Sequence, residues 1–180
     1  WLIPLSLIGT ICGWLYFVSE HASEAFAHAI GERPVVKAML AGLALAICGT
    51  VLPYTMFAGE TQADVLMETY LTIPAGVLIA TGLVKAMLTP ALINLGWRGG
   101  HFFPVIFSGV SLGYGLAILT GADPVFCVAV CTASTMGAVM RQPVMVVGLL
   151  LMCFPLKGIV CMIIAAAIAA GIPLPKPLRK

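Results

Sequence analysis

The sequence predicts an all-α integral membrane protein whose helices are tilted and, in the second half of the chain, broken. Of its 180 residues, 61% are apolar and 9% are charged, and the mean hydropathy is +1.10. Soluble domains are roughly 45–50% apolar and about 25% charged, so this chain lacks the polar surface that a protein in water needs. Residues 35–59 and 99–122 carry almost no charge, and a helix needs ~20 predominantly apolar residues to cross a bilayer. We therefore expect one transmembrane domain over residues 1–180.

The first part of the chain predicts two long helices joined by a turn. Residues 1–19 form an apolar helix candidate that continues as the amphipathic stretch 20–30 and crosses the bilayer at a tilt. Residues 31–34 predict the turn, because Pro34 suits the first position of the next helix. That helix, 35–52, is rich in alanine and glycine, which is typical of helices that pack closely in lipid.

The most polar stretch of the chain, residues 60–70, carries Glu60, Asp64 and Glu68 at helical spacing. Three carboxylates on one helical face suit a cation site or a proton relay. They equally suit a short solvated helix at the membrane surface, which we favour.

From Leu71 onward the apolar tracts are shorter and repeatedly interrupted by proline, glycine and isolated charges. The interruptions are Pro74, Gly76, Gly82, Lys85, Pro90, Gly96, Gly99, Gly100, Pro104, Pro124, Pro143, Pro155 and Gly158. Irregular backbone at membrane depth is tolerated only where protein buries it or where it lines a cavity. Because transporters place their substrates at broken helices, this pattern favours a transport protein over a simple membrane anchor.

Charge and cysteine content exclude several other classes. The net charge of +2 is too small to suggest nucleic acid as a partner. The basic cluster at 176–180 indicates a cytoplasmic end or a patch for lipid headgroups. Cys127 and Cys131 share a helix face, which suits a soft metal, but buried free cysteines usually serve packing. We expect neither a metal nor a cofactor.

The sharpest feature is Gly99-Gly100-His101-Phe102-Phe103-Pro104, followed by the apolar run 105–119. We expect a helix to begin near Pro104, with the glycines allowing backbone geometry that presents several N–H groups on one side. The first turn of a helix leaves about four N–H groups unpaired and carries roughly half a positive charge, so it suits an anion. A glycine-rich connector that closes a buried helix end is the alternative interpretation.

These six residues resemble the third anion-binding signature, Gly-Gly-x-Phe-x-Pro, of the chloride channel and chloride–proton antiporter (CLC) family. Met140-Arg141-Gln142-Pro143 is similar to the x-Arg-x-Pro junction that follows in that family. The glycine-rich run 108–113 and the order of the upstream helices also agree, so the resemblance extends over essentially the whole chain.

The resemblance implies that this chain is the second inverted repeat of a CLC-type transporter, with the N-terminal half absent. The backbone amides of His101, Phe102 and Phe103 would bind the anion, and Gly99, Gly100 and Pro104 would shape the loop. The gating glutamate would lie in the absent half. The implied function is transport of chloride or a similar small anion, by proton-coupled exchange or passive conduction, in the plasma (inner) membrane and without enzymatic activity.

A homodimer is also implied by the resemblance, through a face formed by residues 1–18, 144–154 and 156–170. The small residues at 165–171 suggest a surface for close helix approach.

Three positions depart from the family pattern. His101 replaces an aliphatic residue, and its side chain could tune anion affinity with pH. Arg179 stands where many members have an anion-coordinating tyrosine, so it is either an anion contact or a cytoplasmic anchor. Met152 stands where a carboxylate is usual.

Two other functions were weighed against anion transport. A non-transporting membrane assembly subunit is disfavoured by the interrupted helices. An intramembrane enzyme would draw on three histidines with neighbouring carboxylates, although no His-Glu-x-x-His motif is present. These groups are His21, His28, His101, Glu20, Glu24 and Asp123.

Overall fold

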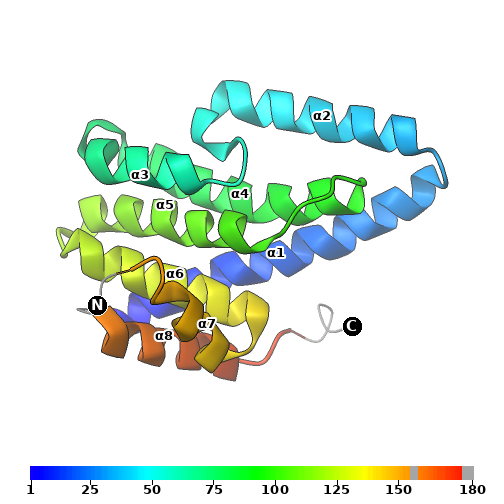
Figure 1. Ribbon diagram of the computed structural model, residues 1–180. Helices are drawn as coiled ribbons and strands as arrows, with labels where there is room; N and C mark the ends of the chain where they lie inside the picture. Colours follow the sequence, from blue (N-terminus) through cyan, green and yellow to red (C-terminus); the bar gives the residue numbers. More distant parts are fainter. Residues whose placement is uncertain (155–157, 176–180) are drawn as a thin grey trace.

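The computed structural model describes residues 1–154 and 158–175, and over these residues every regular element is a helix (Figure 1). Two short 3-10 helices, η1 (Pro53–Thr55) and η2 (Tyr70–Thr72), flank α3. The α-helices are α1 (Leu2–Ile30), α2 (Pro34–Val51), α3 (Glu60–Thr69), α4 (Ala75–Asn94), α5 (Phe102–Thr120), α6 (Pro124–Met140), α7 (Pro143–Leu150) and α8 (Ile159–Gly171). The predicted all-α class is therefore confirmed.

Helix α5 lies at the centre of the molecule. It packs against α4 on one side and α6 on the other, and α6 in turn packs against α1 and α8. Figure 1 shows α2 and α3 on one flank of this core and α7 and α8 on the opposite flank. Residues 105–117 of α5 are all buried, so helices from both halves of the chain cover this helix.

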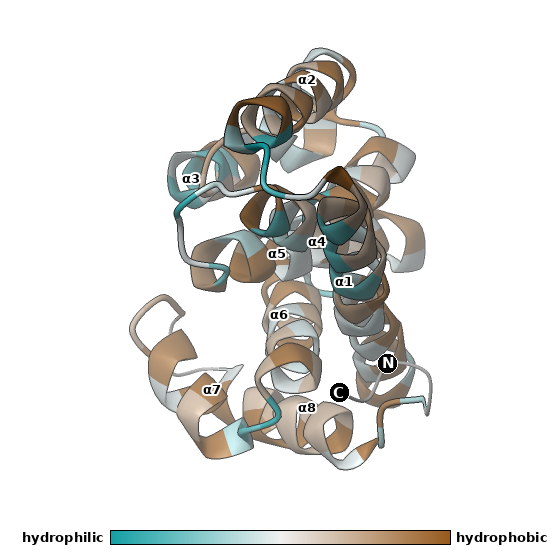
Figure 2. Ribbon diagram, turned by 90° about the vertical axis from the view of Figure 1, so that its right-hand side faces the viewer, coloured by the Kyte–Doolittle hydropathy of each residue, from teal (hydrophilic) through white to brown (hydrophobic). Residues whose placement is uncertain are grey.

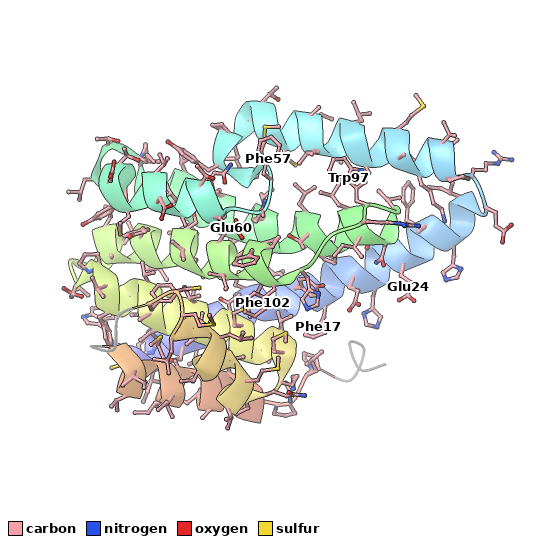
Figure 3. All side chains as sticks on the ribbon, in the orientation of Figure 1. Phe17, Glu24, Phe57, Glu60, Trp97 and Phe102 are labelled. Atoms are coloured by element: carbon pink, nitrogen blue, oxygen red, sulfur yellow. The ribbon has the colours of Figure 1, made fainter. Side chains whose placement is uncertain are left out.

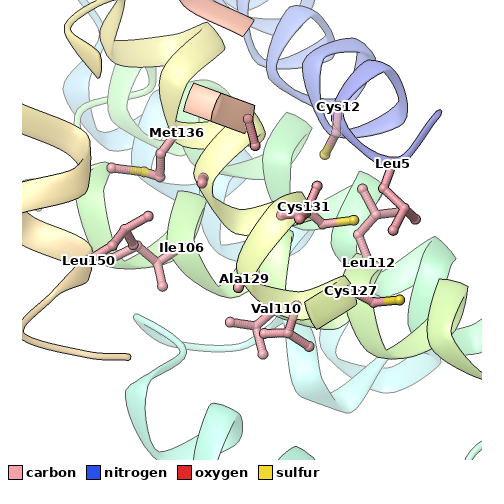
Figure 4. Close-up of a cluster of buried hydrophobic side chains, with 14 of the residues drawn as sticks. Leu5, Cys12, Ile106, Val110, Leu112, Cys127, Ala129, Cys131, Met136 and Leu150 are labelled. Carbon is pink, nitrogen blue, oxygen red and sulfur yellow. The ribbon is translucent and has the colours of Figure 1, made fainter. Parts of the chain in front are cut away.

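Small residues allow the central helices to approach closely. A Cβ atom added at Gly109 would lie 2.4 Å from Thr132 Cα, and one at Gly113 would lie 2.5 Å from Val128 Cα. Around this contact lie the apolar side chains of the core, among them Cys131 on α6 (Figure 4). The glycine-rich run 108–113 therefore serves the contact between α5 and α6.

Helix lengths are unequal, as predicted. Four helices, α1, α2, α4 and α5, are long and apolar enough to cross a membrane, whereas α6 and α8 are shorter apolar helices. Hydrophobic residues dominate every long helix, and the polar residues gather mainly at the connections and on α3 (Figure 2). Glu60, Asp64 and Glu68 are all exposed on α3, which fits the solvated-helix interpretation.

Three of the expected interruptions are absent from α4. The sequence analysis breaks the chain at Gly82, Lys85 and Pro90, but α4 runs continuously through all three. Pro90 removes a single backbone N–H from the helix, and the rest of the hydrogen-bond ladder survives because α1 and α5 support α4 on either side. The break falls instead at the connector between α4 and α5.

The small residues of two helices do not lie where we expected. Only Ala41 of α2 is buried, so this alanine- and glycine-rich helix is at the edge of the described chain (Figure 1). In α8, Ala165, Ala166 and Ala169 are buried, and Ala166 meets Gly137 of α6. These three alanines of α8 therefore line a contact within the chain, whereas Ala167 and Gly171 are exposed on its outer side.

Candidate functional site

The connector between α4 and α5 makes a sharp turn at Gly96. Gly96 has φ of 98°, its N–H donates to Ile93 O at 3.0 Å, and the Trp97 N–H donates to Leu92 O at 3.0 Å. These two bonds close the C-terminus of α4 in a Schellman arrangement, which requires a left-handed residue. The sequence analysis recorded Gly96 only as an interruption, although a glycine just after a helix is a recognisable C-terminal signal.

Helix α5 begins two residues earlier than expected. Its first residue is Phe102, with His101 as the N-cap, so Pro104 occupies the third helical position. Proline is tolerated there because the N–H groups of the first turn have no partner within the helix. The first intrahelical bond runs from Val105 N–H to His101 O at 3.1 Å.

Three backbone amides at this helix end are left without a hydrogen-bond acceptor among the described residues. They belong to His101, Phe102 and Phe103, and no side chain caps the helix. The amides and the helix dipole together give the start of α5 a partial positive charge. The structure thus brings together the three residues that the sequence analysis selected for anion binding.

The expected role of the two preceding glycines is not found. Neither Gly99 nor Gly100 has φ in the left-handed region, and a Cβ at either position would meet no atom within 4 Å. Backbone conformation within the described chain therefore does not require glycine there. Both residues are exposed, and their lack of side chains leaves open space beside the helix end.

Two cavities flank the start of α5. One, of about 280 Å³, is lined by Gly99, Gly100 and Pro104 and reaches Lys85 on α4. The other, of about 410 Å³, is lined by Phe103 and, on its far wall, by Glu60 of α3. Figure 3 labels Phe102 at the start of α5 and Glu60 at the start of α3. The helix end therefore borders hollow space.

Lys85 is the residue of this region that sequence reasoning missed. It lies in the middle of α4 with 3% of its surface exposed. Its Nζ donates to Thr55 O at 2.6 Å and also to Phe57 O. Phe57 has φ of 58°, which is unusual for a bulky residue. A lone lysine inside an apolar tract is itself a signal, since ionisable residues within membrane helices are rare and mark functional positions.

The side chain of His101 is exposed and lies beside α1. Its ring is tilted against that of Tyr16, with the ring centroids 6.2 Å apart. Phe102 and Phe103 form an edge-to-face pair with centroids 5.6 Å apart. The imidazole of His101 therefore lies beside the start of α5, whereas the backbone amide of His101 is one of the three amides at that helix start.

The x-Arg-x-Pro junction has a structural explanation. Arg141 ends α6 in the left-handed conformation, with φ of 56°, and its Nη1 donates to Ile172 O at 2.8 Å. It therefore ties the junction of α6 and α7 to the segment after α8. Met152 is 85% exposed, and Arg179 lies outside the described residues.

Asp123 does not lie with His101, the other group proposed for an intramembrane enzyme on this part of the chain. Asp123 caps α6 by accepting a bond from Phe126 N–H at 2.8 Å. It follows the C-terminus of α5, whereas His101 precedes the N-terminus, and 19 helical residues separate the two ends, about 28 Å at 1.5 Å per residue. His21 Nδ1 lies 3.0 Å from Phe17 O within α1.

Two further chemical motifs are also accounted for by packing. Residues 109–113 spell Gly-x-Ser-x-Gly, but they lie inside a helix and Ser111 Oγ donates to Leu78 O at 2.8 Å, whereas a nucleophile of this type needs a strand-to-helix turn. Cys127 and Cys131 are buried in the core. The described residues hold no group of three His, Cys, Asp or Glu side chains placed to bind a metal ion.

These features define a helical membrane protein in which an uncapped helix end borders cavities, an arrangement that transport proteins use for ion sites. The model of the voltage gated chloride channel family matches residues 1–173. The chain therefore belongs to this family, as the resemblance implied, and it is an integral membrane protein. Members of the family are transporters and channels, and chloride transport is accordingly its general function. No curated protein matches the chain.

Proposed function

We propose that this chain transports chloride or a similar small anion and binds it through the backbone amides of His101, Phe102 and Phe103. The observation that carries the proposal is the uncapped start of α5, where these three N–H groups have no acceptor among the described residues. A dehydrated halide needs several hydrogen-bond donors to replace its water shell, and this helix end supplies them together with the helix dipole.

Binding through amides also suits an ion that has to leave again. A full charge in contact with the ion would hold it more tightly, and conduction requires weak binding. Arg98 is exposed in the connector before the site. In this proposal it raises the local concentration of anions from the aqueous side and does not ligate the bound ion.

Further parts of the proposal follow from membership of the family. The chain is the C-terminal half and second inverted repeat of a longer transporter, and a glutamate in the other half gates the anion. An anion site at the start of α5 is compatible with both proton-coupled exchange and passive conduction. Proton uptake that accompanies chloride flux in liposomes of the full-length protein would identify exchange, and chloride flux without it would identify conduction.

We also propose a homodimer in the plasma (inner) membrane, formed by the outer surfaces of α1, α7 and α8. These surfaces carry large exposed apolar side chains, including Ile3 on α1, Val144 on α7 and Ile163 on α8. The expected mass of the full-length protein in mild detergent and in bilayers is that of a dimer. A monomeric mass in both would contradict this part of the proposal.

The anion site is tested by calorimetry of chloride binding to the full-length protein. His101→Ala should leave chloride binding largely unchanged, because the substitution keeps the backbone amide. Gly100→Val should weaken binding, because its side chain would fill the open space beside the amides. Gly76→Val is the matched control, since it adds the same side chain at an equally open position on α4.

The pair of variants separates a backbone site from a side-chain site. Loss of chloride binding in His101→Ala with normal binding in Gly100→Val would refute the amide site and assign the anion to the imidazole. The same loss in Gly76→Val as in Gly100→Val would show a general effect on the fold.

A further inference from the structure

Lys85 is a buried cation without a counter-ion in the described part of the chain. It lies near the middle of α4, which is long and apolar enough to span a membrane, and only 3% of it is exposed. Among the described residues its Nζ donates to two backbone carbonyls, those of Thr55 and Phe57, and lies over the ring of Phe107, 6.0 Å from the ring centroid, and it contacts no carboxylate. An ammonium group has three N–H donors, so one donor remains after these two bonds.

Two carbonyls do not neutralise the charge. A charged side chain at membrane depth is costly, and such residues almost always pair with an opposite charge or face a cavity. Buried charges are in general paired, because an unpaired charge loses its hydration without compensation. The position of Lys85 therefore calls for a negative partner.

The cavity next to Lys85 offers the place for that partner. Its volume is about 280 Å³, and Lys85 lines it together with Gly99, Gly100 and Pro104 of the connector and α5. Since one water molecule occupies about 30 Å³ in the liquid, the cavity has room for an ion with part of its water shell. Gly99 and Gly100, which line it, are exposed, so an ion can reach the cavity from this side.

The remaining lining of the cavity favours an anion over a cation. Arg98 of the connector is a second positive side chain on its wall, and no acidic side chain lines it. Apolar groups such as Phe57 and Leu88 make up much of the rest. The electrostatic potential inside such a low-dielectric cavity is positive, because both charged side chains that line it are cations.

We propose that Lys85 holds a small inorganic anion of the halide type in this cavity, as a second anion site on the α4 side of the connector. The site shares Gly99, Gly100 and Pro104 with the surroundings of the amides of His101, Phe102 and Phe103, but it depends on a buried ammonium group instead of a helix end. It does not need the amide site in order to exist. The bound anion is the counter-ion that lets Lys85 remain charged while it fixes the carbonyls of Thr55 and Phe57.

The test is bromide binding to the full-length protein, observed as anomalous scattering in crystals and by calorimetry in solution. In the wild type, we expect anomalous density in the cavity beside Lys85 Nζ. In Lys85→Gln this density should disappear, and the calorimetric affinity of that site should fall ~10-fold or more, as expected on loss of a charged hydrogen bond. Lys85→Arg should retain the density, because it retains the charge.

The controls separate this inference from the proposed function. Lys37→Gln removes a lysine from α2, outside the cavity lining, and should change neither site. Bromide density in the cavity without density at α5 would refute the amide site and leave the Lys85 site intact.

Two results would overturn the inference. One is wild-type crystals with no bromide in the cavity, including the case where a carboxylate from another part of the full-length protein occupies it. The other is unchanged cavity density in Lys85→Gln. If Lys85→Gln does not fold, the wild-type crystals and the retention of density in Lys85→Arg still decide the question.

Discussion

Helices α5 and α2 have similar length and similar apolar character, yet they occupy opposite environments. In the most apolar 18-residue window, 72% of α5 is buried inside the described chain, against 6% of α2. Both helices contain small residues: α5 has three glycines and one alanine, and α2 has two glycines and four alanines. Hydropathy therefore indicates that a segment enters the membrane, but it does not indicate whether protein or lipid surrounds it.

The difference lies in what the small residues meet. On α5, Gly109 and Gly113 face the backbone of α6 at distances that leave no room for a side chain. On α2, a Cβ at Gly42 would meet no atom within 4 Å. A small residue permits close packing only where a second helix lies opposite it, so a small residue alone does not show that its helix packs against protein.

The largest expected effect is that of Gly113→Ala in the α5–α6 contact. The added Cβ would lie 2.5 Å from Val128 Cα, a backbone atom that can move only if the helices separate. Overpacking of this kind typically costs ~1–3 kcal/mol. We expect a clearly lower Tm of the full-length protein in mild detergent, measured by the loss of its monodisperse chromatographic peak on heating. An unchanged Tm would show that α5 and α6 are more loosely packed than the structure has them.

A smaller effect is expected at the start of α6. Asp123 accepts a hydrogen bond from Phe126 N–H at 2.8 Å, whereas the N-cap of α2, Arg33, makes no side-chain cap. Replacing an aspartate cap with alanine costs ~1 kcal/mol. Asp123→Ala should therefore lower the Tm less than Gly113→Ala, and Asp123→Asn should restore most of the loss. Arg33→Ala should leave the Tm unchanged, and a loss there as large as in Asp123→Ala would contradict the contrast.

Much of the fold could be predicted from the sequence, because the relevant signals are local. Pro34 opens α2 as expected, and α6 lies between Pro124 and Pro143, which the sequence marks as interruptions. The continuous helix through Pro90 could not be predicted in this way, because it depends on support from α1 and α5, which are distant in sequence. Proline and glycine residues in the sequence indicate where a helix can end, and tertiary packing decides whether it ends there.

The candidate site likewise has one part that the sequence predicts and one part that it does not. The sequence placed the helix start to within two residues, and the amides of His101, Phe102 and Phe103 do lie together at its end. Lys85 was seen only as an interruption, because nothing in its neighbours shows that Thr55 and Phe57, which lie 30 and 28 positions away, supply its acceptors. A helix start that one motif marks can be predicted from a sequence, whereas contacts between distant segments cannot.

The smallest effect is expected from Gly42→Ala, which makes the same chemical change on α2 that Gly113→Ala makes on α5. No atom of the described chain lies within 4 Å of the added Cβ, and alanine is favoured over glycine inside a helix by ~1 kcal/mol. The Tm of the full-length protein should therefore stay the same or rise slightly. A fall in Tm like that of Gly113→Ala would mean that protein outside the described residues covers this face of α2. Both helices would then be buried in the full-length protein, α5 by helices of the described chain and α2 by protein outside the described residues.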